Sequence, residues 1–391
     1  TGLALNPNTG ALSTTPSATG TFNFQITATD TAAPGTCTGV RSYTVHIGSS
    51  VAAGDLVIRE FRLRGPASAT DEYIVVHNRA TSPITVAATD GSAGFAVASS
   101  DNNVVFTIPN GTVIPARGHF LGVNTAGFSL GGTHDASWTT DIADGLGLAL
   151  FKTATPASFT APNALDAVGI GSSAAPFLEG TALTSLTTPG EYAWVRKAVN
   201  DMPQDTGANS ADFVLVATNG AVYNTVQSIL GAPAPTRSTT RDVFAGMTVA
   251  SIEPSVGVNL NPNRLRVLAG GDRLEFRRRI TNNTGVTLNS IRFRFNEIST
   301  FNSPGYSPGT TQSDLRPGTS ATVTVPATSI GATSITGLTL LTPPAQPIGG
   351  GWNSVLTLPG SLAPGASVDV NVALYVTRVG AYRFFATIEA Q

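Results

Sequence analysis

The residues that could perform catalysis or bind a metal are few and widely spaced in this sequence. The four histidines, His46, His77, His119 and His134, show neither an HExxH pattern nor the His/Cys spacing of a zinc site. The sequence also contains no G-x-S-x-G elbow, G-x-G-x-x-G loop or P-loop, so acyl, hydride and phosphoryl transfer lack their usual residues. We therefore predict that the protein is not an enzyme and uses no cofactor, and that its histidines are ordinary polar residues.

Carboxylates come close together at two places in the sequence. Asp71 and Glu72 are adjacent, and on a strand they would point to opposite faces, where they could not easily share a substrate. Asp141 and Asp144, with Asp135 nearby, supply enough oxygen atoms to suggest calcium. Their spacing is not that of a calcium loop, and a turn before a strand explains them equally well. Asp135, Asp141 and Asp144 are thus weak calcium candidates.

Arginines form the clearest charge pattern. Arg277 and Arg279 share the solvent side of one expected strand, and Arg292 and Arg294 share that of the next, so pairing of the strands would place four guanidinium groups on one face. The part of the chain that carries them is basic, whereas the rest is acidic. The pattern fits either a solvated face or head-to-tail contact between copies. Nucleic acid is a weaker interpretation, because the aromatic residues of these strands alternate inward.

Apolar and polar residues alternate with a period of two along most of the chain, which predicts an all-β protein. Charged residues make up only 12%, about half of the ~25% of an ordinary globular protein, and Gly and Pro are abundant. This composition is typical of secreted and cell-surface proteins, and no run approaches the ~20 apolar residues of a membrane-spanning helix. The single cysteine, Cys37, lies in an expected loop and excludes an intramolecular disulfide. We expect a mature or trimmed extracellular form.

The chain divides into three expected modules, 1–50, 51–230 and 241–391, and a Pro/Ala/Thr-rich linker at 231–240. In the first module Leu3 and Leu5 precede the turn residues NPNTG, and about four strands are expected. Phe22 and Phe24 face one side of a strand, with Asn23 and Gln25 on the other.

Sequence motifs in each module resemble known families. GLALNPNTGALSTTPSATGTFNFQITATD resembles the second half of an immunoglobulin-like repeat of bacterial surface proteins, matched over 2–47. LVIREFRLRGPASATDEYIVVHN, followed by IPARGHFLGV and DGLGLALFKT, resembles the lamin-tail domain over about 53–230. The third module resembles C-terminal immunoglobulin-like domains of large bacterial secreted proteins through NPNR and RRRITNNTG.

These resemblances imply three serial immunoglobulin-like β-sandwich modules, of which the first is incomplete, and they imply no catalytic residues. Glu60, Asp71 and Glu72 fall on lamin-tail motif positions, where we expect them to satisfy strand ends and loop amides. Two sequons, at Asn110 and Asn282, could carry glycan.

An incomplete sandwich exposes unpaired backbone groups and an apolar face. The cost is a few kcal/mol for each unpaired polar group and about 25 cal/mol per Å² of apolar surface, so either an upstream segment or another copy must cover it. We expect a non-enzymatic extracellular structural protein, a homo-oligomer or polymer that forms a filament or layer by strand complementation. The alternative is a C-terminal binding or accessory module of a larger secreted hydrolase or adhesin. The expected assembly interface consists of Leu3, Leu5, Phe22, Phe24, Arg277, Arg279, Arg292 and Arg294.

Overall fold

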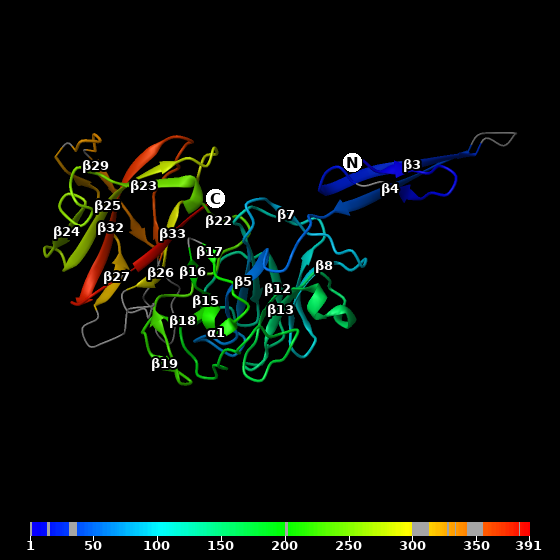
Figure 1. The fold of residues 1–391 in the computed structure, drawn as a ribbon, viewed down its shortest axis with the longest axis horizontal. Coiled ribbons are helices and arrows are strands. Elements are labelled where there is room, and N and C mark those ends of the chain that lie inside the picture. Colours follow the sequence, from blue (N-terminus) through cyan, green and yellow to red (C-terminus); the bar gives the residue numbers. More distant parts are fainter. Residues whose placement is uncertain are drawn as a thin grey trace.

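The computed structural model of the chain is all-β, as the alternation predicts. The structure describes residues 2–13, 16–30, 37–199, 202–298, 313–326, 328–332, 334–341, 355–382 and 384–391. Figure 1 shows an N-terminal ribbon, a central unit and a C-terminal unit in series along the long axis. Within the described part, helix is limited to α1 (Asn209–Asp212) and three single 3₁₀ turns (Pro156–Ser158, Ala161–Asn163 and Phe244–Gly246). No helix in this part is long and apolar enough to cross a membrane.

The N-terminal region consists of two separate two-stranded sheets, β1 (Ala4–Leu5) with β2 (Leu12–Ser13) and β3 (Gly20–Asp30) with β4 (Cys37–Ile47). The four expected strands and the predicted NPNTG turn are confirmed. The Asn6 side-chain oxygen accepts a hydrogen bond from the Asn8 amide at 2.9 Å, which is the local bond that favours Asn at the start of a turn.

The central unit is a sandwich of two antiparallel-dominated sheets. The seven-stranded sheet has the order β12-β11-β6-β5-β15-β18-β21, and the four-stranded sheet has the order β14-β13-β8-β9. The strands are β5 (Leu56–Arg62), β6 (Tyr73–Asn78), β7 (Ile84–Thr85), β8 (Gly94–Ser99), β9 (Val104–Pro109), β10 (Val113–Ile114), β11 (His119–Asn124), β12 (Ala136–Trp138), β13 (Leu148–Phe151), β14 (Ala164–Val168), β15 (Tyr192–Arg196), β16 (Ala198–Val199), β17 (Met202–Pro203), β18 (Phe213–Ala217), β19 (Val222–Tyr223), β20 (Val226–Gln227) and β21 (Ile229–Leu230).

The core of the central unit lies between these two sheets. Ile58, Val76 and Trp194 come from the seven-stranded sheet, and Val97 and Leu150 come from the four-stranded one. The opposite face of the seven-stranded sheet is also covered, so all seven residues of β5 are buried. Both faces of this sheet are therefore interior surfaces.

The C-terminal unit has a five-stranded sheet, β22-β33-β26-β31-β30, and a seven-stranded sheet, β23-β25-β32-β29-β28, with β24 on β25 and β27 on β32. Phe276 and Val372 from one sheet meet Phe293 and Ile388 from the other in the core. The strands are β22 (Arg241–Asp242), β23 (Met247–Ser251), β24 (Arg264–Val267), β25 (Arg273–Asn282), β26 (Arg292–Ile298), β27 (Asp314–Gly318), β28 (Val323–Thr324), β29 (Ser334–Gly337), β30 (Thr339–Leu340), β31 (Val355–Thr357), β32 (Ser367–Arg378) and β33 (Phe384–Ala390).

Residues 231–240, the expected linker, contain no strand or helix, but half of them are buried. The Ala234 amide donates to Glu60 at 2.9 Å, and the Ser238 amide donates to Asp135 at 2.8 Å. The segment is thus fastened to the central unit by hydrogen bonds. It brings β22 beside β11, where Gly118 and Arg241 form an isolated bridge.

Candidate functional site

The ribbon formed by β3 and β4 extends away from the central unit (Figure 1). Each strand has 11 residues, and the register runs from Gly20 opposite Ile47 to Asp30 opposite Cys37 without a bulge. The Cys37 backbone begins β4, whereas the sequence predicted a loop there, and its side chain lies outside the described part. The regularity follows from β-branched and aromatic residues alternating with small polar ones.

One face of the ribbon is apolar. Phe22, Phe24 and Ile26 lie on it opposite Val45, Tyr43 and Arg41. The Phe24 and Tyr43 rings stack at 5.8 Å, and the Arg41 guanidinium lies 5.3 Å from the Tyr43 ring centroid. Among the described residues, no buried hydrophobic cluster includes a residue of 2–50. The apolar face of the ribbon therefore packs against neither sandwich core.

The other face of the ribbon is polar and internally hydrogen-bonded. Thr44 donates to Asn23 at 2.7 Å, and Thr21 lies 2.9 Å from the His46 ring. This face therefore satisfies its own polar groups. At the root of the ribbon, the Thr85 amide donates to Ser49 at 2.9 Å, which ties the chain to the central unit.

The structure separates the residues of the expected assembly interface. Phe22 and Phe24 share the apolar face, as predicted, but Leu5 belongs to the separate β1–β2 sheet and is 42% exposed, and Leu3 precedes β1. Phe22, Phe24 and Leu3 are each half-buried.

The prediction that the arginine strands pair is wrong. β25 belongs to one sheet of the C-terminal unit and β26 to the other, because the chain between them crosses the sandwich and buries Leu288 and Ile291 completely. Each arginine is instead held in an ion pair: Arg277 with Glu275 at 3.0 Å, Arg279 with Asp369 at 2.8 Å, Arg292 with Glu389 at 3.0 Å, and Arg294 with Glu389 at 2.7 Å and Glu60 at 3.1 Å.

The last of these arginines lies in a buried ionic network between the central and C-terminal units. Arg294 of β26 bridges Glu60 of the central unit and Glu389 of its own unit. Arg59 of β5 reaches in the opposite direction and lies 3.1 Å from Asp242 of β22. Arg59 and Asp242 are under 10% exposed, as are Arg294, Glu60 and Glu389. The two units thus share charge pairs that neither could form alone.

His77 and His119 join this network, which the sequence did not predict. Their ring nitrogens and the Asp242 carboxylate lie within 4.8 Å of one another, a set of ligand types that could bind zinc. However, Nη1 of Arg59 lies 3.1 Å from both oxygens of Asp242 and contacts Nε2 of His119. A guanidinium therefore occupies the space between the three side chains that a metal ion would need.

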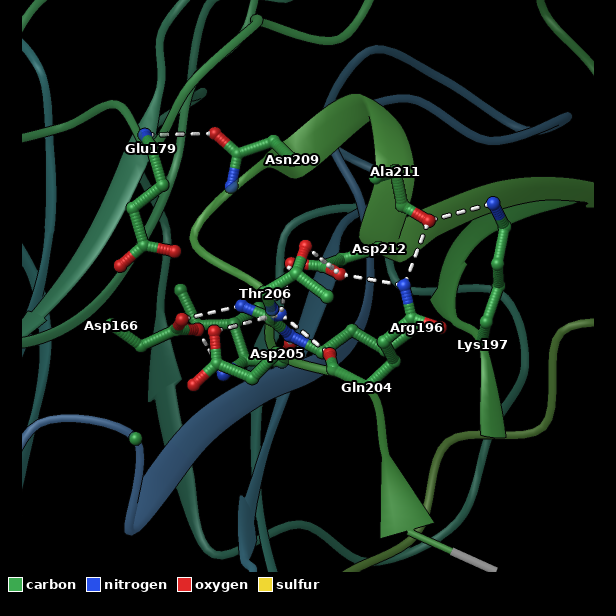
Figure 2. A network of polar contacts seen from close by, with 12 residues as sticks. Asp166, Glu179, Arg196, Lys197, Gln204, Asp205, Thr206, Asn209, Ala211 and Asp212 are labelled. Atoms are coloured by element: carbon green, nitrogen blue, oxygen red, sulfur yellow. Dashed lines mark hydrogen bonds and ion pairs between the residues drawn. The ribbon is translucent and has the colours of Figure 1, made fainter. Parts of the chain in front are cut away.

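A second cluster of carboxylates surrounds Arg196 (Figure 2). Asp166, Glu179 and Asp205 bring oxygen atoms within 4.8 Å of one another. Burial raises the pKa of Asp166 to about 6, and burial followed by repulsion from Asp166 raises that of Glu179 to about 8. Arg196 contacts Asp166 and lies 3.7 Å from Asp205. The guanidinium and a proton on Glu179 together offset the negative charge, which fits a structural role.

The calcium candidates do not form a common site. Asp135 accepts from the Leu121 amide at 2.8 Å and from Ser238, and Asp144 pairs with Arg64. Asp141 is exposed. Within the described ranges, neither group of side chains that could hold a metal includes any of the three.

The carboxylates Glu60, Asp71 and Glu72 accept hydrogen bonds from loop amides, as expected. Glu72 accepts from the Ile142 amide at 2.9 Å, Asp71 from the Ser129 amide at 2.9 Å, and Glu60 from the Ala234 amide. Asp71 also contacts Arg62, and burial raises the pKa of Glu72 to about 7.

The two sequon asparagines are both engaged in hydrogen bonds. Asn282 is fully buried, and its amide nitrogen donates to the carbonyls of Val286 and Leu362, each at 2.8 Å. Asn110 donates to the Ser92 carbonyl at 2.7 Å. A glycan on Asn282 is incompatible with this fold.

No protein-family model matches the chain, and no curated protein or solved structure matches it. The family resemblances of its motifs therefore stay predictions.

Proposed function

We propose that this protein is a non-enzymatic, extracellular structural subunit that associates with further copies of itself through the β3–β4 ribbon and so builds a filament or layer. The observation that carries the proposal is the apolar face of a two-stranded ribbon that packs on neither core. An isolated two-stranded hairpin is at best marginally stable in water, and three or more strands with a hydrophobic face are needed for independent stability. The ribbon therefore requires a partner.

The edges of the ribbon support strand addition. β3 and β4 pair only with each other in the described part of the chain, so the outer edge of each presents unpaired backbone groups. Natural edge strands are usually protected by lysine, proline or a bulge. Neither strand contains lysine or proline, and their pairing has no bulge. These edges are open to another strand.

A second copy of the ribbon fits these edges. The edge of β3 can pair antiparallel with the same edge of another copy about a two-fold axis, and the edge of β4 can do the same. Because the two self-complementary edges lie on opposite sides of one ribbon, their combined use gives an open-ended chain of copies. The apolar faces then join into one wider sheet.

We further infer that the three modules are serial immunoglobulin-like sandwiches and that the first is completed in the assembly. The two sheets around each large core and the low content of charged residues, 12%, support this inference.

A pair of matched substitutions tests the proposal. Phe24→Asp places a charge on the apolar face, whereas Asn23→Asp adds the same charge to the polar face one residue away. We expect the wild-type chain to form oligomers in sedimentation velocity and ordered assemblies in electron microscopy. Asn23→Asp should behave like wild type, and Phe24→Asp or removal of residues 1–48 should give monomers.

The proposal fails if the wild-type protein stays monomeric at tens of micromolar, which would favour an accessory module of a longer polypeptide. It also fails if the chain without residues 1–48 assembles unchanged, or if Asn23→Asp disrupts assembly as strongly as Phe24→Asp.

A further inference from the structure

Two histidines lie between the central and C-terminal units. His77 of β6 and His119 of β11 are direct register partners, with ring centroids 4.8 Å apart, and neither is exposed. They occupy the face of the central sheet that the C-terminal unit covers with Asp242. His77 Nε2 is 4.0 Å and His119 Nε2 is 3.8 Å from the Asp242 carboxylate. We call His77, His119, Arg59 and Asp242 the interface cluster.

The hydrogen bonds of His119 require its neutral form. Nδ1 lies 2.9 Å from the Thr240 carbonyl oxygen, which can only accept, so Nδ1 carries the hydrogen. Nε2 contacts Nη1 of Arg59, which can only donate, so Nε2 must offer its lone pair. A proton on Nε2 would place two donors against each other and break the contact with Arg59.

Among the described residues, none accepts a hydrogen bond from the His77 ring, so a proton added to His77 would have no acceptor there. Within the described ranges, both ring nitrogens are buried without a hydrogen-bond partner, and a carboxylate oxygen of Asp242 lies 4.0 Å away. A charged His77 would therefore be an imidazolium that lacks a hydrogen bond inside the interface, which is strongly unfavourable.

The surrounding charges oppose protonation further. Burial is the main reason that the pKa of each histidine lies well below its ordinary value, and neighbouring positive charge adds to it. The charged groups that face the pair from the elements packed around it are the cations Arg59, Arg117, Arg292 and Arg294 and the anions Glu60, Asp242 and Glu389. These groups include four cations and three anions, so their net charge is positive. A proton on either histidine would add a further positive charge.

We propose that the interface cluster is an acid-sensitive latch, which holds the central and C-terminal units together at neutral pH and releases them in mildly acidic medium when His77 and His119 take up protons. The latch is independent of the assembly function of the ribbon. A small hollow, large enough for about one water molecule, is lined by Arg59 and Asp242 and gives solvent a place beside the cluster.

The sign and size of the effect follow from proton linkage. A histidine whose pKa is lowered in the joined state binds protons mainly when the units separate, so the joined state loses stability as pH falls below about 6.5. Between pH 7 and pH 5, each histidine shifts the equilibrium toward separation about 25-fold. Burial raises the pKa of Asp242 to about 6, so its protonation favours the joined state and opposes the shift about tenfold. The net expectation is about a 60-fold shift toward separation.

Hydrogen exchange of the whole chain tests the latch, since the protection factor reports local opening after correction for intrinsic exchange rates. The informative peptides cover residues 236–246, where the Asp242 amide donates to the Arg117 carbonyl at 2.9 Å. Strands β8 and β13 of the central core serve as the internal reference. From pH 7 to pH 5, we expect protection of 236–246 to fall about 60-fold while protection of the reference strands stays within about threefold.

The matched variants are His77→Phe with His119→Gln, which removes both titrating groups, and His134→Gln, which removes an exposed histidine. We expect protection of 236–246 in the double variant to rise about tenfold from pH 7 to pH 5, because only Asp242 still titrates, and we expect His134→Gln to behave like wild type. If the double variant does not fold, His77→Phe alone should reduce the pH response to a few-fold. The proposal is overturned if wild-type protection at 236–246 does not fall, if the core strands lose protection equally, or if the variants without His77 respond like wild type.

Discussion

Replacement of Arg294 by methionine tests whether the ionic network joins the two large units. Arg294 is 5% exposed, and its guanidinium lies 3.1 Å from Glu60 in the central unit and 2.7 Å from Glu389 in the C-terminal unit. Methionine preserves much of the side-chain volume while it removes the charge and both ion pairs. The perturbation therefore leaves packing nearly intact and leaves two buried carboxylates without this partner.

Glu389 and Glu60 differ in the partners that they keep after the substitution. Glu389 keeps Arg292 at 3.0 Å and Arg59 at 3.7 Å. Glu60 keeps Tyr73 and the Ala234 amide, but both bond to Oε1, so Oε2 loses its ion-pair partner. Loss of one partner of a buried pair typically costs about 3–5 kcal/mol, because the remaining charge stays desolvated. We expect Arg294→Met to lower the free energy of unfolding by about this amount, mainly through Glu60.

Urea unfolding followed by tryptophan fluorescence and circular dichroism measures this cost. Arg266→Met is the control, because its pair with Asp272 is 49% and 32% exposed and should contribute about 0–1 kcal/mol. Adding Glu60→Gln to Arg294→Met should restore about 1–3 kcal/mol, since the neutral amide removes the stranded charge. Equal effects of Arg294→Met and Arg266→Met, or a double variant less stable than Arg294→Met, would refute this account of the interface.

Two further predictions concern the central unit. Because the pKa of Glu179 is raised to about 8, the folded state holds a proton that the unfolded state releases, so the folded state loses stability as pH rises toward and past 8. Glu179→Gln should therefore raise Tm at pH 9 but not at pH 5. An equal change in Tm at both pH values would contradict the assignment. Gly94 has φ +153°, and an added Cβ would lie 2.0 Å from the Ile108 carbonyl oxygen, whereas Gly91 has φ +78° and open space; Gly94→Ala should cost about 3 kcal/mol or more and Gly91→Ala about 1–2 kcal/mol in chemical denaturation, and equal costs would show that the close approach is relieved.

Local features of the chain could be predicted from the sequence because they depend on neighbouring residues. The Asn6 turn and the alternation that places Phe22 and Phe24 on one face follow from backbone geometry and short-range hydrogen bonds. These preferences act within a few residues and need no knowledge of strand order.

The prediction that the arginine strands pair was wrong because strand order depends on residues further apart than these local preferences reach. β25 and β26 follow each other in the chain, and the sequence of each alternates as expected, but the burial of Leu288 and Ile291 carries β26 into the opposite sheet. Consecutive strands usually lie side by side, and here the core determines otherwise. Arg294 consequently faces the central unit rather than solvent.

The sequence by itself determined the all-β class, the apolar face of the ribbon and the Asn6 turn between β1 and β2, because alternation and turn chemistry depend on adjacent positions. Only the tertiary structure decided that His77, His119 and Asp242 meet, since two sandwiches had to pack before β22 could lie beside β11. His77 and His119 occupy matching places on strands that the sequence does not pair. Their partner Asp242 lies at least 123 residues further along the chain, so no periodicity of the sequence connects it to them. Electrostatic contacts between units depend on this packing, and local sequence carries no record of it.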